Sequence, residues 1–149
     1  MAYEQLRLGR QLCFRLYTAS RLVVQAYTPL LSRLGLTYTQ YLAMMVLWER
    51  DGQLVTEIGR RLQLEMNTIS PLIRRLEREG LLTRRTCPTD RRQQIISLTD
   101  KGRQLEHQAA EVPGCLLDTI EGCGLSMDDL LPLIPLLDNL NGKMKGDGK

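Results

Sequence analysis

The chain has 149 residues, of which 43% are hydrophobic and 25% charged, with a formal net charge of +3 at pH 7. These values are typical of one soluble globular domain, and there is no apolar run of about 18 residues that would indicate a membrane-spanning helix. The first residues, MAYEQLRLGRQLC, carry scattered charges and no small-residue cleavage site, so we expect no secretory signal and a cytoplasmic protein.

A long amphipathic helix is predicted over residues 4–33, because apolar residues recur there at intervals of three and four. It is apolar around more than one stripe, so we expect it to contact more than one partner. Thr37 is placed to cap a second helix over residues 38–50, and Asp51-Gly52 indicates a turn after it.

Residues 53–103 predict a compact module that ends in a hairpin. In order, the module has a helix over 55–61, a turn over 62–65, a helix over 66–79 and two strands over 81–86 and 93–98, joined by a tip over 87–92. This order is typical of a winged helix-turn-helix, which places its second helix in a DNA major groove and the hairpin beside it. The segment holds 11 Arg or Lys against 6 Asp or Glu, a net charge of +5, so positive charge gathers where a polyanion would bind.

The C-terminal part is predicted to be helical. Thr99 starts a helix over 100–122 that Pro113 and Gly114 should kink or break. Ser126, with Asp129 three residues later, forms a capping pattern for a last, leucine-rich helix over 127–141.

The fold class expected is mainly α with a small β-wing, in a single domain over 1–149. A DNA-binding lobe over 36–103 lies between dimerisation helices over 1–35 and 104–144, and a flexible tail follows over 145–149. The terminal helices could complete a monomeric core, but the winged module does not need them to fold. We therefore favour a homodimer, which would place two recognition helices about one DNA turn apart on a pseudo-palindromic operator.

Cysteine and histidine usage limits the chemistry. Cys13, Cys87, Cys115 and Cys123 form no CxxC pair and are too sparse for a disulfide scaffold, so each is expected to be a buried or a redox-active thiol. His107 is the single histidine. We therefore expect neither a metal site nor a cofactor.

The chain resembles the MarR family of bacterial regulators over nearly its whole length. The stretch most specific to that family is D-R-R-x-x-x-I-S-L-T-x-K-G, which stands here as Asp90-Arg91-Arg92, Ile96-Ser97-Leu98-Thr99 and Lys101-Gly102. The N-terminus is similar to the peroxide-sensing OhrR branch, because residues 12–21 read LCFRLYTASR. Two tyrosine contexts of that branch, A-Y-x-P-L-L and L-G-L-T-Y-x-Q-Y, are also present and contain Tyr27 and Tyr38.

The resemblance implies a dimeric repressor that is released from double-stranded DNA when organic hydroperoxide oxidises Cys13. The thiolate is the nucleophile in such a reaction, and phenol O–H donors aimed at a sulfur favour its anion. Tyr17, one helical turn from Cys13, can also lie near it. Tyr27 is nearly four turns along, so it must reach the partner's cysteine or fold back after a bend; the resemblance implies the cross-subunit arrangement. Without the resemblance, these residues would be interpreted as core packing.

The product would be a sulfenic acid, which a second thiol or a small-molecule thiol traps. Some members of the branch carry a resolving cysteine, for which Cys115 is favoured over Cys123. A one-cysteine mechanism remains open. Cys87, at the wing base, is interpreted as a bystander.

For DNA, the resemblance places Arg92 in the minor groove and Asp90 as the group that orients it, with Arg91 beside them; a guanidinium suits the negative potential of a narrow A·T-rich groove. In the second module helix, short polar groups can meet base edges and phosphates, and two arginines can meet phosphates: Asn67, Thr68, Ser70, Arg74 and Arg75.

One alternative to the peroxide-sensing repressor is a regulator released by a phenolic or lipophilic ligand bound between the dimer and DNA-binding lobes. Another is a thiol peroxidase, for which the basic module would be unnecessary.

Overall fold

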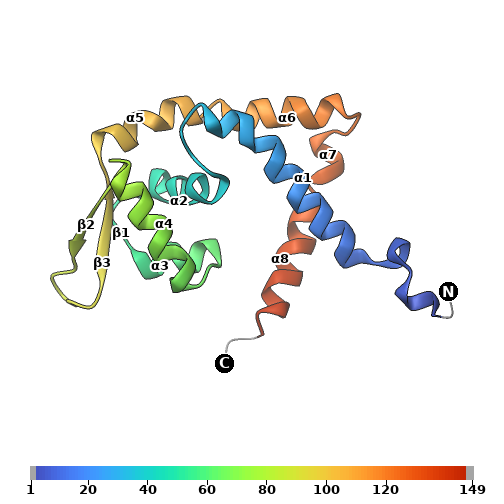
Figure 1. Ribbon diagram of the computed structural model, residues 1–149, viewed down its shortest axis with the longest axis horizontal. Helices are drawn as coiled ribbons and strands as arrows, with labels where there is room; N and C mark the ends of the chain where they lie inside the picture. The colour runs from blue at the N-terminus through green and yellow to red at the C-terminus, as the bar shows by residue number, and fades with distance from the viewer. Residues whose placement is uncertain (1–2, 147–149) are drawn as a thin grey trace. The chain divides into compact units, whose positions relative to one another are not determined.

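The computed structural model describes residues 3–146, and Figure 1 traces their helices and strands. The chain divides into two compact units, one up to Val112 and one from Pro113 onward, and each is described by itself. The elements are mostly helices, together with one three-stranded antiparallel sheet, so the predicted fold class is confirmed.

The first long helix begins later than predicted. Two 3-10 turns, η1 (Glu4–Leu6) and η2 (Leu8–Arg10), precede α1 (Leu12–Ser32). Side chains satisfy the backbone carbonyls of this segment in place of helical N–H groups, because Gln11 Nε2 donates to Gln5 O at 2.7 Å and Arg15 Nη2 donates to Gly9 O at 2.6 Å. Cys13 therefore lies in the first turn of α1, not inside a longer helix.

The second helix, α2 (Tyr38–Glu49), begins as predicted. Thr37 Oγ1 accepts from the backbone N–H of Gln40, and Gln40 Oε1 accepts from the backbone N–H of Thr37, which completes a capping box. Ala43, Met44 and Leu47 of α2 are fully buried, so this helix is the centre of the core.

The winged module follows as α3 (Val55–Leu62), α4 (Met66–Arg78), β2 (Leu82–Thr86) and β3 (Gln94–Leu98), with the hairpin of β2 and β3 extending to one side of α3 and α4 in Figure 1. The apolar spacing of α4 buries Ile69, Ile73 and Leu76 against the core. Its end is set by Gly80, whose φ of +77° is a left-handed conformation that favours glycine.

The sequence pattern missed a third strand, β1 (Gln53–Leu54), because two residues are too short for alternation to be read. The sheet order is β1-β3-β2, and both pairs are antiparallel, with Gln53 opposite Ile96 and Leu82 opposite Leu98. The central strand β3 is therefore paired on both edges.

The helix predicted over 100–122 is two helices, α5 (Asp100–Ala109) and α6 (Val112–Gly122). Thr99 caps α5 as predicted, since its hydroxyl accepts from Gly102 N. The break precedes Pro113, which is the second residue of α6, where the missing N–H costs no helical hydrogen bond.

The second unit contains α7 (Met127–Leu130) and α8 (Leu133–Met144) where a single helix is predicted over 127–141, and α8 runs three residues beyond the predicted end. Ser126 and Asp129 form the predicted capping box. The helix is interrupted at Pro132, which has no N–H to continue the hydrogen-bond ladder. Of the tail predicted over 145–149, residues 147–149 lie outside the described residues.

Large apolar side chains remain uncovered on α1 and α8. Leu31 is the one fully buried residue that α1 contributes. The exposed apolar residues of these two helices are Leu12, Phe14, Tyr17, Leu22, Val23, Leu133, Ile134, Leu136, Leu140 and Met144. Within the described residues, no helix is long and apolar enough to cross a membrane.

Candidate functional site

The start of α4 presents short polar groups to solvent. Asn67 and Thr68 are exposed in its first turn, and Ser70 is half-buried. Pro71 is the sixth residue of α4 and has no N–H, so the carbonyl of Asn67 lacks its usual helical donor. Arg74 and Arg75 follow on the exposed side, which gives this helix polar and cationic groups that suit DNA.

At the tip of the wing (residues 82–98), Asp90 holds Arg92. Asp90 Oδ1 accepts from the backbone N–H of Arg92 at 3.0 Å and from its Nε at 3.3 Å. The hydrogen bonds from Arg92, the backbone one first, hold the pKa of the Asp90 carboxyl below its usual value. The Arg92 side chain is nevertheless 92% exposed, so its guanidinium is oriented but free to enter a groove. Arg91 is also exposed.

The wing is tied to α4 by an ion pair that the sequence pattern did not reveal. Arg84 of β2 donates from Nε and Nη2 to the two carboxylate oxygens of Glu77, at 3.2 and 3.0 Å. Bidentate pairs of this kind fix geometry as well as charge. The pair therefore links the hairpin to α4 on the surface of the module.

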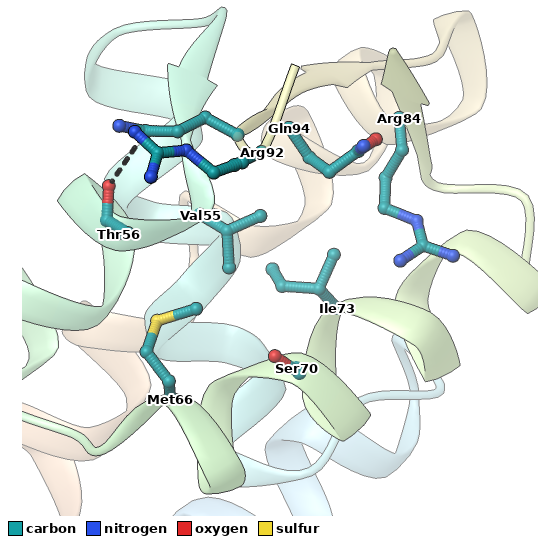
Figure 2. A pocket seen from close by; sticks show the side chains of 9 residues that line it. Val55, Thr56, Met66, Ser70, Ile73, Arg84, Arg92 and Gln94 are labelled. Atoms are coloured by element: carbon teal, nitrogen blue, oxygen red, sulfur yellow. Dashed lines mark hydrogen bonds between the residues drawn. The ribbon is translucent and has the colours of Figure 1, made fainter. Parts of the chain in front are cut away.

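A cavity of about 210 Å³ lies between α3, α4 and the wing. Figure 2 shows apolar side chains from the two helices on one side and polar side chains from the strands and wing on the other. Its lining residues are Val55, Thr56, Met66, Ser70, Ile73, Arg84, Arg92, Gln93 and Gln94. Thr56 Oγ1 donates to Gln93 Oε1 at 3.2 Å, which joins α3 to the wing across this cavity. Arg92 and Ser70, both of which are expected to contact DNA, thus line the same cavity.

A tyrosine cluster lies where α1 meets α2. The ring centroids of Tyr27 and Tyr38 are 4.9 Å apart, and those of Tyr27 and Tyr41 are 5.8 Å apart. Burial raises the pKa of all three phenols, and the neighbouring Tyr38 adds to the effect on Tyr27 and Tyr41. These hydroxyl groups therefore remain protonated hydrogen-bond donors well above neutral pH.

Cys13 is exposed near the start of α1 and is not part of this cluster. Tyr27 lies 14 positions further along the same helix, which corresponds to about 21 Å at 1.5 Å per residue. Because α1 is one continuous helix from Leu12 to Ser32, the chain does not fold back between them. Tyr17 is one turn from Cys13 and is exposed.

The other thiols have different surroundings. Cys115 lies in α6 and Cys123 follows its end, and both are exposed, as a resolving thiol must be. Cys87 lies 3.3 Å from the hydroxyl of Thr89. That hydroxyl, followed by backbone N–H groups of Thr89 and Asp90, lowers the pKa of the Cys87 thiol. The sequence pattern did not reveal these contacts of Cys87, and its interpretation as a bystander stays a prediction. Among the described residues, no group of three or more His, Cys, Asp or Glu is placed to hold a metal ion.

Comparison with known proteins identifies the family. Residues 36–93 match the model of the MarR family. The organic hydroperoxide resistance transcriptional regulator of Bacillus subtilis is 38% identical over 142 residues, covering 95% of this chain and 97% of that protein.

Two solved structures of AbfR, a protein of Staphylococcus epidermidis, are also similar. The reduced form bound to DNA is 37% identical, covers 97% of both chains and has a TM-score of 0.77. The disulfide form is 39% identical, covers 95% of both chains and has a TM-score of 0.64. The chain therefore belongs to the MarR family, and it is a DNA-binding transcriptional regulator rather than an enzyme.

Proposed function

We propose that this regulator is a homodimeric, cytoplasmic repressor that binds a pseudo-palindromic operator and releases it when organic hydroperoxide oxidises Cys13. The main support is the pair of half-buried phenols, Tyr27 and Tyr38, which lie 4.9 Å apart with raised pKa values. Two protonated phenols side by side can donate two hydrogen bonds to one thiolate, which is the form of a cysteine that attacks a peroxide. The relative from Bacillus subtilis, named for organic hydroperoxide resistance, supports the choice of oxidant.

The thiolate would come from a second copy of the chain. Cys13 and Tyr27 are about 21 Å apart on one helix, so the phenols of one chain do not meet its own cysteine. The uncovered apolar residues of α1, which include Leu12, Phe14 and Leu22, lie on the same helix and offer a surface for the partner. An antiparallel approach of two α1 helices would bring Cys13 of each toward the tyrosine cluster of the other, so the site is incomplete without the second copy.

The reaction balances with the hydroperoxide as the oxidant. The Cys13 thiolate attacks one peroxide oxygen, the O–O bond breaks, and the alkoxide leaves and takes up a proton to become the alcohol. The sulfur is oxidised to a sulfenic acid. A second thiol, from Cys115, Cys123 or a small molecule, then forms a disulfide with Cys13 and releases water. The disulfide form solved for AbfR supports this second step.

For DNA, the proposed contacts are Arg92 of each wing, oriented by Asp90 and placed in the minor groove with Arg91 beside it, and the start of α4 in the major groove. Asn67, Thr68 and Ser70 would meet base edges and phosphates, and Arg74 and Arg75 the phosphates.

The first experiment measures DNA release. The reduced protein selects its operator from a random duplex pool, and the labelled operator complex is titrated with cumene hydroperoxide. Wild type is expected to release the DNA and Cys13→Ser to remain bound. Cys87→Ser is the matched control, because Cys87 has a lowered pKa and lies in the wing; it should behave as wild type. Release of Cys13→Ser at the same peroxide concentration would refute the sensor, and release by a phenolic acid alone would favour the ligand-sensing alternative.

A second experiment separates the cross-subunit site from a site within one chain. Heterodimers of a Cys13→Ser chain and a Tyr27→Phe chain contain one intact site if the tyrosine acts across the interface, and none if it acts within its own chain. A heterodimer of a wild-type chain and a chain with both Cys13→Ser and Tyr27→Phe contains no intact site if the tyrosine acts across the interface. It contains one intact site if the tyrosine acts within its own chain. Fast oxidation of Cys13 is expected in the first heterodimer only, and the opposite result would refute the cross-subunit arrangement.

A further inference from the structure

The start of α5 is bound to the C-cap of α4 and the two residues after it by three hydrogen bonds to successive carbonyls. The carbonyl of Glu79 accepts from Lys101 Nζ at 2.8 Å. The carbonyl of Gly80 accepts from Thr99 Oγ1 at 2.6 Å, and that of Leu81 accepts from Thr99 N at 3.0 Å. The Glu79 carbonyl, at the C-cap of α4, lacks an intrahelical partner, and a cation there also interacts favourably with the helix dipole. The bond from Thr99 N to Leu81 O continues the pairing of β2 with β3 by one residue. We call this contact, residues 79–81 with 99–102, the α4–α5 joint.

The joint is closely packed. A Cβ added to Gly102 would lie 2.3 Å from the carbonyl oxygen of Leu81, so only glycine allows this approach. From the other side, Trp48 Nε1 donates to the carbonyl of Gly102 at 3.0 Å. Asp51 Oδ1 accepts from Leu98 N at 2.8 Å. The direction of α5 is therefore fixed against both α4 and the end of α2.

Lys101 is far from the end of α4 that is placed to read bases. From Met66 to Glu79 the helix advances about 20 Å, and the Lys101 ammonium already donates to the Glu79 carbonyl. The wing, by contrast, is fixed to α4 through Arg84 and Glu77. Each winged module is thus a unit that can read one half-site. The joint helps to hold the orientation of that unit relative to α5.

A two-fold dimer reads a palindrome when the separation of its two recognition helices matches the half-site spacing, about one DNA turn or a multiple of it. If the dimer is held together by its terminal helices, α5 is one of the connections between those helices and the winged module, so its contact with α4 contributes to that separation. We propose that the α4–α5 joint sets the spacing between the two recognition helices, and that Lys101 and Thr99 are positioning residues for operator recognition that do not touch DNA. This inference rests on the homodimer proposed above.

The test compares a palindrome with a single half-site. Lys101→Met removes the donor but keeps the apolar stem, and Lys101→Arg keeps a donor. Lys143→Met, in α8, makes the same change in net charge and serves as the control. Affinities of the reduced proteins are measured at several salt concentrations. The duplexes are the selected palindrome, one half-site, and palindromes with the half-sites moved by one base pair.

Lys101→Met is expected to bind the palindrome roughly fivefold more weakly, since it loses one charged hydrogen bond. Its half-site affinity and its salt slope should match wild type, and its discrimination between half-site spacings should fall. Lys101→Arg should restore palindrome binding, and Thr99→Ser should retain it where Thr99→Val does not. A merely structural role would lower thermal stability but would not alter spacing preference.

Equal losses on half-site and palindrome, with a smaller salt slope, would identify Lys101 as a phosphate ligand and overturn the proposal. Wild-type affinities of Lys101→Met on every duplex would also overturn it. If wild type itself binds half-site and palindrome equally, the homodimer is refuted and the joint has no spacing to set. If wild type prefers the palindrome and Lys101→Met does so equally, the joint alone is refuted.

Discussion

Gly102→Ala should destabilise the protein although it improves helix propensity. The added Cβ would lie 2.3 Å from Leu81 O, so the two must separate by about 0.7 Å to reach 3.0 Å. That movement stretches the hydrogen bond from Thr99 N to Leu81 O and the one from Trp48 to Gly102 O, both now 3.0 Å long. Overpacking costs about 1–3 kcal/mol, two weakened hydrogen bonds cost up to about 1 kcal/mol each, and the alanine returns about 1 kcal/mol of propensity.

The expected net loss is about 2 kcal/mol, which lowers the melting temperature of a chain of this length by about 4–8 °C. Urea unfolding and calorimetry would measure it. Gly142→Ala is the matched control, because Gly142 also lies in a helix but has no neighbouring atom within 4 Å of the added Cβ; it should be neutral or stabilising. A Gly102→Ala protein as stable as wild type would refute the close approach at the joint.

Other predictions concern the wing and the tyrosines. Arg92→Ala should weaken operator binding by about 1–3 kcal/mol per half-site if its guanidinium contacts a groove; unchanged affinity in anisotropy titrations would exclude it as a reading element. Tyr27→Phe or Tyr38→Phe should slow oxidation of Cys13 and leave DNA affinity unchanged, since each removes one of the two proposed donors to the thiolate. Thiol-alkylation kinetics would measure the oxidation rate, and wild-type rates in both variants would exclude the two phenols from the sensor site. Because the pKa of Asp90 is lowered in the folded state, its hold on Arg92 is complete above the ordinary aspartate pKa and is lost as pH falls through the lowered value; an Asp90 carboxyl that titrates by NMR at its ordinary value would contradict this.

Local signals in the sequence located most of the fold. Thr37, Thr99 and Ser126 were recognised as caps because a cap depends on residues three positions away. The sequence predicts a break near Pro113, about one turn later than the structure has it, since a proline fits the first turn of a new helix. The apolar spacing predicts too early a start for α1, because the 3-10 turns depend on side chains such as Gln11 and Arg15 reaching back to carbonyls.

Contacts between different elements are harder to predict from the sequence than local signals are. Thr99, Lys101 and Gly102 stand within one sequence motif, but their partners are residues 79–81, and the whole wing separates the two segments in the sequence. The same holds for Arg84 and Glu77, which pair across two elements. Tyr27 and Tyr38 were selected by resemblance, and the fold places their rings in contact. The proposed relation of these tyrosines to Cys13 involves a second chain, which no pattern within one chain can display.

The most direct measurement follows Cys13 oxidation and DNA release in the same sample. Operator-bound protein is mixed with cumene hydroperoxide, anisotropy records release, and aliquots are quenched with a sulfenic-acid probe and a thiol-alkylating reagent for mass spectrometry. The fraction of DNA released is expected to rise with the fraction of oxidised Cys13 and not with oxidation of Cys87. Full release while Cys13 remains a thiol, or full oxidation of Cys13 to the sulfenic acid or disulfide with the operator still bound, would contradict the proposed sensor.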